Sequence, residues 1–108
     1  MNKYHNVRTE LGGIMFDSRR EAARWADLSL LERLGKIHEL RRQVTFVLIP
    51  SCEGPDGKRL RAVKYIADFT YRDQRGFHVE DAKGVRTDVY RLKKRLMWHV
   101  HQIDIEEV

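Results

Sequence analysis

The sequence predicts an α/β domain whose elements follow the order α-β-β-β-α-β, with a mixed four-stranded sheet flanked by two helices. Two segments, one in each half of the chain, repeat apolar residues at near-helical spacing. Three β-branched or alternating segments lie between them, separated by clusters of turn residues. The 108 residues, 42% of them hydrophobic, suffice for one core and are too few for two domains.

The chain opens with a basic segment, residues 1–13, which we expect to be an extended arm. It carries Lys3 and Arg8, has little to bury, and ends in two glycines. Its expected role is that of a tail or of a contact to a ligand. Residues 14–108 are then predicted to form the single domain.

The first helix is predicted at residues 17–34. Ser18 and Glu21 match an S-x-x-E capping box, and Gly35 follows the helical pattern as a stop. The apolar residues at near-helical spacing are Ala22, Trp25, Ala26, Leu30, Leu31 and Leu34.

Three strands are predicted next, as an antiparallel meander. Residues 43–51 and 60–71 form the arms of a long hairpin, because the turn cluster EGPDGK separates them at 53–58. The polar stretch 72–76 returns the chain into a third strand at 77–83, which Gly84 ends.

A second helix and a last strand complete the predicted order. Thr87 can cap this helix, and HQIDIEEV closes the chain with Ile103 and Ile105 in alternation. The helical residues expected to point inward are Val89, Tyr90, Leu92, Leu96 and Met97.

The third strand carries an acid and a base on one face. Strand side chains alternate, so Asp81 and Lys83 point the same way, whereas Ala82 and Glu80 point to the other side. Placing an ion pair on a half-covered sheet costs desolvation free energy, so a function is indicated. An exposed pair that only stabilises the sheet is the alternative.

A second carboxylate can approach this pair. Asp68 lies among apolar residues of the preceding strand, and a hairpin with its turn at 72–76 could place it beside Asp81. Paired carboxylates suit Mg²⁺, a hard cation that takes oxygen ligands and can activate water for attack on phosphorus. Alternatively, Asp68 pairs with Lys64 or Arg61, and Glu21 is merely a capping residue.

Asp68 followed by Asp81-Ala82-Lys83, after a helix bearing Glu21, resembles the PD-(D/E)XK nuclease superfamily with its restriction-endonuclease-like fold. More closely, KYHNVRTELGGIMFDSRREAARW and VEDAKG resemble a phage and prophage family of short proteins of unknown function assigned to that superfamily. One departure is Ala67, because the motif has proline before the first aspartate.

The resemblance implies specific roles. Asp68 and Asp81 would bind Mg²⁺ or Mn²⁺, Glu21 would complete the acidic cluster, and Lys83 would position the attacking water or help to deprotonate it. Small members of the superfamily include Holliday junction resolvases, so cleavage of branched DNA during phage DNA metabolism is the expected activity. A chain with one site needs two copies to cut two strands, hence the expectation of a homodimer.

The charge of the chain favours DNA as the partner. The net charge is +5, and residues 86–101 hold five basic residues against one acidic residue. With Lys3 and Arg8 of the arm, the predicted DNA contacts are Arg86, Arg91, Lys93, Lys94 and Arg95.

The longest apolar run is far too short for a membrane span, so we expect no membrane partner and a cytoplasmic location. The resemblance implies that this is the cytoplasm of a bacterial host and that the gene is of phage or prophage origin. Two other functions stay open on the sequence. The chain could be a non-catalytic nucleic-acid-binding module of the same fold, or a small interaction protein of phage assembly.

Overall fold

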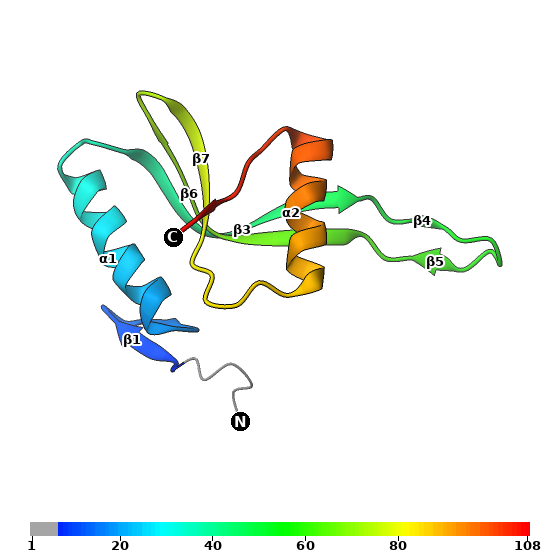
Figure 1. Cartoon of the computed structure of the whole chain (residues 1–108), viewed down its shortest axis with the longest axis horizontal. Helices are drawn as coiled ribbons and strands as arrows, with labels where there is room; N and C mark the ends of the chain where they lie inside the picture. Colours follow the sequence, from blue (N-terminus) through cyan, green and yellow to red (C-terminus); the bar gives the residue numbers. More distant parts are fainter. Residues whose placement is uncertain (1–6) are drawn as a thin grey trace.

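The computed structural model describes residues 7–108, which form two helices, a four-stranded sheet and two short hairpins (Figure 1). Lys3 of the predicted arm lies outside the described residues. The elements are β1 (Thr9–Leu11), β2 (Ile14–Phe16), α1 (Arg19–Arg33), β3 (His38–Ile49), β4 (Cys52–Glu53), β5 (Arg59–Leu60), β6 (Val63–Asp73), β7 (Gly76–Asp81), α2 (Asp88–His101) and β8 (Glu106–Glu107).

The main sheet is mixed, as the sequence predicts. Its strand order is β3-β6-β7-β8, with antiparallel pairs β3/β6 and β6/β7 and a parallel pair β7/β8. The order α-β-β-β-α-β is therefore confirmed for α1, β3, β6, β7, α2 and β8. The short β8 lies beside the end of β7 that carries Asp81.

Each helix covers a different part of the long β3/β6 hairpin. Near the β6/β7 turn, Phe69 and Tyr71 of β6 pack with Leu28 of α1. In the other half of β6, Tyr65 and Ala67 pack with residues of α2. Figure 1 shows the result, with α1 beside one end of the hairpin and α2 crossing its middle. The sheet between the two helices is where the candidate site lies.

The inner face of α2 differs from the prediction. Tyr90 and Met97 are buried, but Val89 and Leu92 are 63% and 59% exposed. Successive helical residues are rotated by about 100°, so residues 90 and 97 share one direction while 89 and 92 point away from it. The same rotation brings Lys93 and Lys94 to the borders of the inner face, where both are half-buried.

Part of the segment 1–13, for which we expected an extended arm, forms a strand. Thr9–Leu11 pairs with Ile14–Phe16 in a hairpin whose turn glycines, Gly12 and Gly13, have φ of 58° and 83°. Such left-handed backbone favours glycine. Phe16 is fully buried, so this hairpin belongs to the folded domain.

Some strand boundaries differ from the predicted ones, in places where the sequence lacks apolar alternation. β3 begins at His38 rather than at residue 43, because its first five residues are largely polar and give no period-two pattern. Glu39 and Gln43 have positive φ, so this edge strand is irregular. The predicted strand 60–71 is divided between β5 and β6, and the predicted strand 77–83 ends at Asp81, before Lys83.

Both helix caps follow the sequence. The Ser18 hydroxyl accepts a hydrogen bond from the amide of Glu21, and the Thr87 hydroxyl accepts one from the amide of Tyr90. Within residues 7–108, neither helix is long and apolar enough to cross a membrane.

Candidate functional site

The candidate site lies where β6 and β7 separate, which we call the β6/β7 fork. The two strands are paired from Asp73 and Gly76 to Phe69 and Glu80, and the pairing ends there. Beyond that point the amide of Ala82 donates to Oδ2 of Asp68 over 2.8 Å. Beyond the last backbone pair, the Asp68 carboxylate therefore links the two strands through this hydrogen bond.

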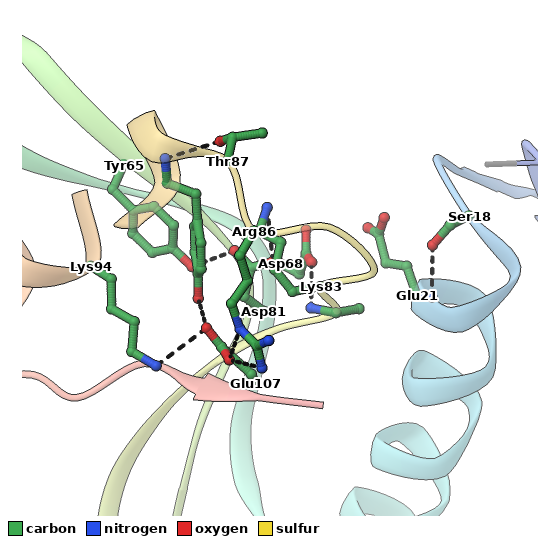
Figure 2. Close-up of polar contacts among 12 residues, drawn as sticks. Ser18, Glu21, Tyr65, Asp68, Asp81, Lys83, Arg86, Thr87, Lys94 and Glu107 are labelled. Carbon is green, nitrogen blue, oxygen red and sulfur yellow. Dashed lines mark hydrogen bonds and ion pairs between the residues drawn. The ribbon is translucent and has the colours of Figure 1, made fainter. Parts of the chain in front are cut away.

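Asp81 is the buried member of the site. Its side chain is 4% exposed, the hydroxyl of Tyr65 donates to Oδ2 over 2.6 Å, and Nζ of Lys83 lies 3.3 Å from Oδ1. Figure 2 shows Tyr65, Asp81 and Lys83 converging near the fork. Burial and the hydrogen bond to Asp81 raise the pKa of Tyr65, so it stays a proton donor that fixes this carboxylate. The predicted pairing of Asp81 with Lys83 is confirmed.

Burial and the charges of the other site residues shift the pKa of Asp68. Its pKa is raised to about 7, first by burial and then by the charge of Asp81. The hydrogen bond from Ala82 and the charge of Lys83 act in the opposite direction, and the charge of Glu21 adds to the rise. Repulsion among three carboxylates is the condition that a bound divalent cation would relieve.

Glu21 reaches toward this group from α1. Its backbone amide donates to the capping hydroxyl of Ser18, while its side chain accepts a hydrogen bond from Nε2 of Gln43 over 3.2 Å and lies 3.9 Å from the Arg42 guanidinium. Figure 2 shows the carboxylate pointing from the helix toward Asp68 and Lys83. Burial, followed by the charge of Asp17, raises the pKa of Glu21. The capping bond thus uses the Glu21 backbone amide and leaves its side chain free to contact β3.

Glu80 points away from the site, as the alternation predicts. It is 1% exposed and accepts two hydrogen bonds from Arg24 of α1, at 2.7 and 2.6 Å, and a third from Tyr71. This arrangement ties β7 to α1 and makes Glu80 a structural residue.

Several of the predicted DNA contacts are already paired with acids. Arg86 and Lys94 bind the carboxylate of Glu107 at 2.6 and 3.2 Å, and Arg91 lies 3.2 Å from Asp88. Burial would raise the pKa of Glu107, but the hydrogen bonds from Tyr90, Arg86 and Lys94 lower it to about 2. The pairs at Glu107 fasten α2 to β8. Arg8 and Arg95 are exposed.

A groove of about 300 Å³ opens beside Asp81. Lys64 of β6, Lys83 and Lys93 of α2 line it together with Asp81. Its apolar lining includes Val89, which explains why this exposed residue is not part of the core. A groove with three cations beside a carboxylate suits a phosphodiester backbone.

The carboxylates at the fork offer oxygen donors to a metal ion. Among residues 7–108, no three His, Cys, Asp or Glu side chains are grouped closely enough to hold an ion by themselves. Mg²⁺ is commonly bound through one or two carboxylates while it keeps several waters. The oxygen donors of Asp68 and Asp81, with Glu21 nearby, fit this mode of binding.

Sequence reasoning missed Tyr65, Tyr90, Gln43 and Glu107. Each contacts the site or its supports from a different element, so no local spacing reveals it. Gln43 lies opposite Asp68, between the pairs Arg42 with Phe69 and Val44 with Ala67. Only a correct register of the β3/β6 hairpin could have identified it.

These features define an α/β domain with a carboxylate and lysine cluster at a strand fork. The family model described as "Protein of unknown function (DUF1064)" matches residues 1–107, and the chain belongs to this family. No curated protein and no solved structure matches the chain.

Replacing Asp68 by Asn is expected to stabilise the metal-free protein. Because the pKa of Asp68 is higher in the folded state than the usual 3.8, ionisation lowers stability as pH rises from about 4 through about 7. Asn is neutral at every pH and can still accept from Ala82. A gain of about 1 kcal/mol at pH 8 corresponds to a rise of about 4 to 8 °C in melting temperature.

Thermal melts of both proteins between pH 4 and pH 8 measure this effect, with EDTA present. The difference should be largest at pH 8 and vanish toward pH 4, and Mg²⁺ should raise the melting temperature of the natural protein but not that of Asp68→Asn. The exposed Asp104 supplies the control Asp104→Asn, which should melt like the natural protein at each pH and should be stabilised by Mg²⁺ to the same extent. A pH-independent difference would contradict a charge-based cause.

Proposed function

We propose that this protein is a metal-dependent endonuclease that hydrolyses phosphodiester bonds in DNA with Mg²⁺ or Mn²⁺, on a restriction-endonuclease-like fold of the PD-(D/E)XK superfamily. The observation that carries the proposal is the meeting of Asp68, Asp81 and Lys83 at the β6/β7 fork, with Glu21 directed at them from α1. The mixed sheet flanked by two helices agrees with that fold.

Each residue of the site has a distinct role in this proposal. Asp68 and Asp81 would hold the metal ion, with Glu21 completing the acidic cluster. The ion would supply Lewis acidity toward the phosphate and a bound water of lowered pKa. Lys83, held 3.3 Å from Asp81, would orient the attacking water and offset negative charge on the phosphate. Tyr65 keeps Asp81 in position through its hydrogen bond.

The substrate class follows from charge and size. The groove lined by Lys64, Lys83 and Lys93 supports binding of a nucleic acid backbone. One site in a domain of this size cuts one strand, so we propose a homodimer. The resemblance to small Holliday junction resolvases implies branched DNA, such as four-way junctions, as the substrate. The process served would be phage DNA metabolism in the bacterial cytoplasm.

Cleavage assays test the proposal directly. Purified protein is incubated with supercoiled plasmid, linear duplex, single strand and a four-way junction, each with Mg²⁺, Mn²⁺ or EDTA. We expect cutting with either metal, none with EDTA, and preference for the junction. Absence of cleavage of every substrate at high protein concentration would reject the nuclease.

A non-catalytic DNA-binding module is the second candidate. The groove lined by Lys64, Lys83 and Lys93 favours it, because these cations can bind a phosphodiester backbone without any metal ion. Such a module should bind DNA equally well with EDTA and with Mg²⁺, and should not cut. A small interaction protein of phage assembly should show no salt-sensitive DNA binding at all.

A further inference from the structure

We propose that the projecting hairpin of residues 50–62, here called the β4/β5 arm, is a second nucleic-acid contact that follows the DNA backbone away from the cutting site. This inference rests on the proposed function. It assigns a binding role to Arg59 and Arg61, which lie outside the basic segment 86–101 and outside the groove beside Asp81.

The arm is a preformed hairpin that adds nothing to the core. The amide of Gly54 donates to the carbonyl of Lys58 over 2.7 Å, and the Asp56 side chain accepts from the Lys58 amide over 3.0 Å. A Cβ on Gly54 would meet the Lys58 carbonyl at 3.1 Å, so this tight turn favours glycine. Figure 1 shows the arm extending beyond the main sheet, and its residues are exposed except for Gly54 and Ala62. Its surface is thus available to a partner.

The charge of the arm indicates which partner. Residues 50–62 contain three basic residues and two acidic residues, namely Lys58, Arg59 and Arg61 against Glu53 and Asp56. The Asp56 side chain accepts a hydrogen bond within the turn. Among residues 50–62, Leu60 is the one large apolar side chain that is exposed. A basic and largely polar surface fits a polyanion better than an apolar protein surface.

A row of basic residues along the chain, Arg59, Arg61 and Lys64, joins the arm to the groove beside Asp81. Lys64, at the beginning of β6, lines the same groove as Lys83, Lys93 and Asp81. From Lys64 to Arg59 an extended chain spans at most about 17 Å. Phosphates of one DNA strand advance about 3.4 Å each along the helix axis, so the row could follow about five nucleotides beyond the groove.

The length of the DNA provides a sharp test. The double variant Arg59→Gln and Arg61→Gln is made together with Asp81→Asn, so that nothing is cut. Affinity is measured by fluorescence anisotropy against salt, with duplexes of about 10 and about 30 base pairs. Loss of two phosphate contacts should make the slope of log affinity against log salt shallower by about 1.8 on the long duplex. The change should be much smaller on the short one.

Two exposed basic residues at the other end of the molecule give the matched control. Lys36 follows α1 and Arg75 lies in the β6/β7 turn, and Lys36→Gln with Arg75→Gln should leave the slope unchanged. If Asp81→Asn alone binds DNA and the arm variant has the same slope on both duplexes, the arm assignment is wrong and the nuclease proposal stands.

Two other results would also overturn the inference. A change from dimer to monomer in sedimentation equilibrium, with an unaltered salt slope, would make the arm an interface between two copies. If the natural protein neither binds nor cuts DNA, the arm assignment and the proposed function fail together.

Discussion

Asp81→Asn is expected to lower the single-turnover cleavage rate by more than about 10²-fold while leaving the fold and DNA binding intact. The substitution removes the buried negative charge that would hold the metal ion and that now faces Lys83 at 3.3 Å. Asn has nearly the same shape, and its carbonyl can still accept from Tyr65. DNA binding should stay equal or tighten slightly, because one negative charge beside the phosphate is lost.

Cleavage by excess enzyme, anisotropy and thermal melts separate these effects. Lys83→Ala is the companion variant and should cut very slowly while still binding the metal. If Asp81→Asn cuts at the rate of the natural protein, Asp81 is not a metal ligand of the reaction.

Glu80→Gln is expected to destabilise the fold by about 2 kcal/mol without removing the cleavage chemistry. Glu80 accepts hydrogen bonds at 2.7 and 2.6 Å from Arg24, and these bonds are the main cause of the raised pKa of Arg24. The neutral amide leaves the Arg24 guanidinium without its counter-charge in a half-buried position. The melting temperature should therefore fall by about 8 °C or more.

The same pair offers its own control. Replacing Arg24 by Met in the Glu80→Gln protein removes the unpaired charge and should recover part of the lost stability. Cleavage is compared at a temperature where each variant is folded. Loss of cleavage in folded Glu80→Gln, with activity retained in Asp81→Asn, would show that the functional carboxylate is Glu80.

The sequence predicts the site residues that local geometry controls. Alternation along β7 separates Asp81 from Glu80, and the hairpin turn sets the register that brings Asp68 to the fork. Capping at Ser18 and Thr87 is likewise local, because each hydroxyl binds an amide three residues later.

Contacts between distant elements could not be predicted in this way. Tyr65 of β6 donates a hydrogen bond to Asp81 of β7 beyond the last backbone pair of the two strands. Glu107 accepts hydrogen bonds from Tyr90 and Lys94 of α2 and from Arg86 of the preceding loop. The outward positions of Val89 and Leu92 depend on which side of α2 meets the sheet. Their hydrophobicity alone favours burial, but Val89 lines the groove instead.

The most direct test of the account is the position of a metal ion in crystals soaked with Mn²⁺. The account predicts an anomalous-scattering peak at the β6/β7 fork, within coordination distance, roughly 2.0 to 2.6 Å, of carboxylate oxygens of Asp68 and Asp81. The peak should be absent from Asp81→Asn crystals. Mn²⁺-dependent cleavage in solution, with a peak at other residues and none at the fork, would contradict the central claim.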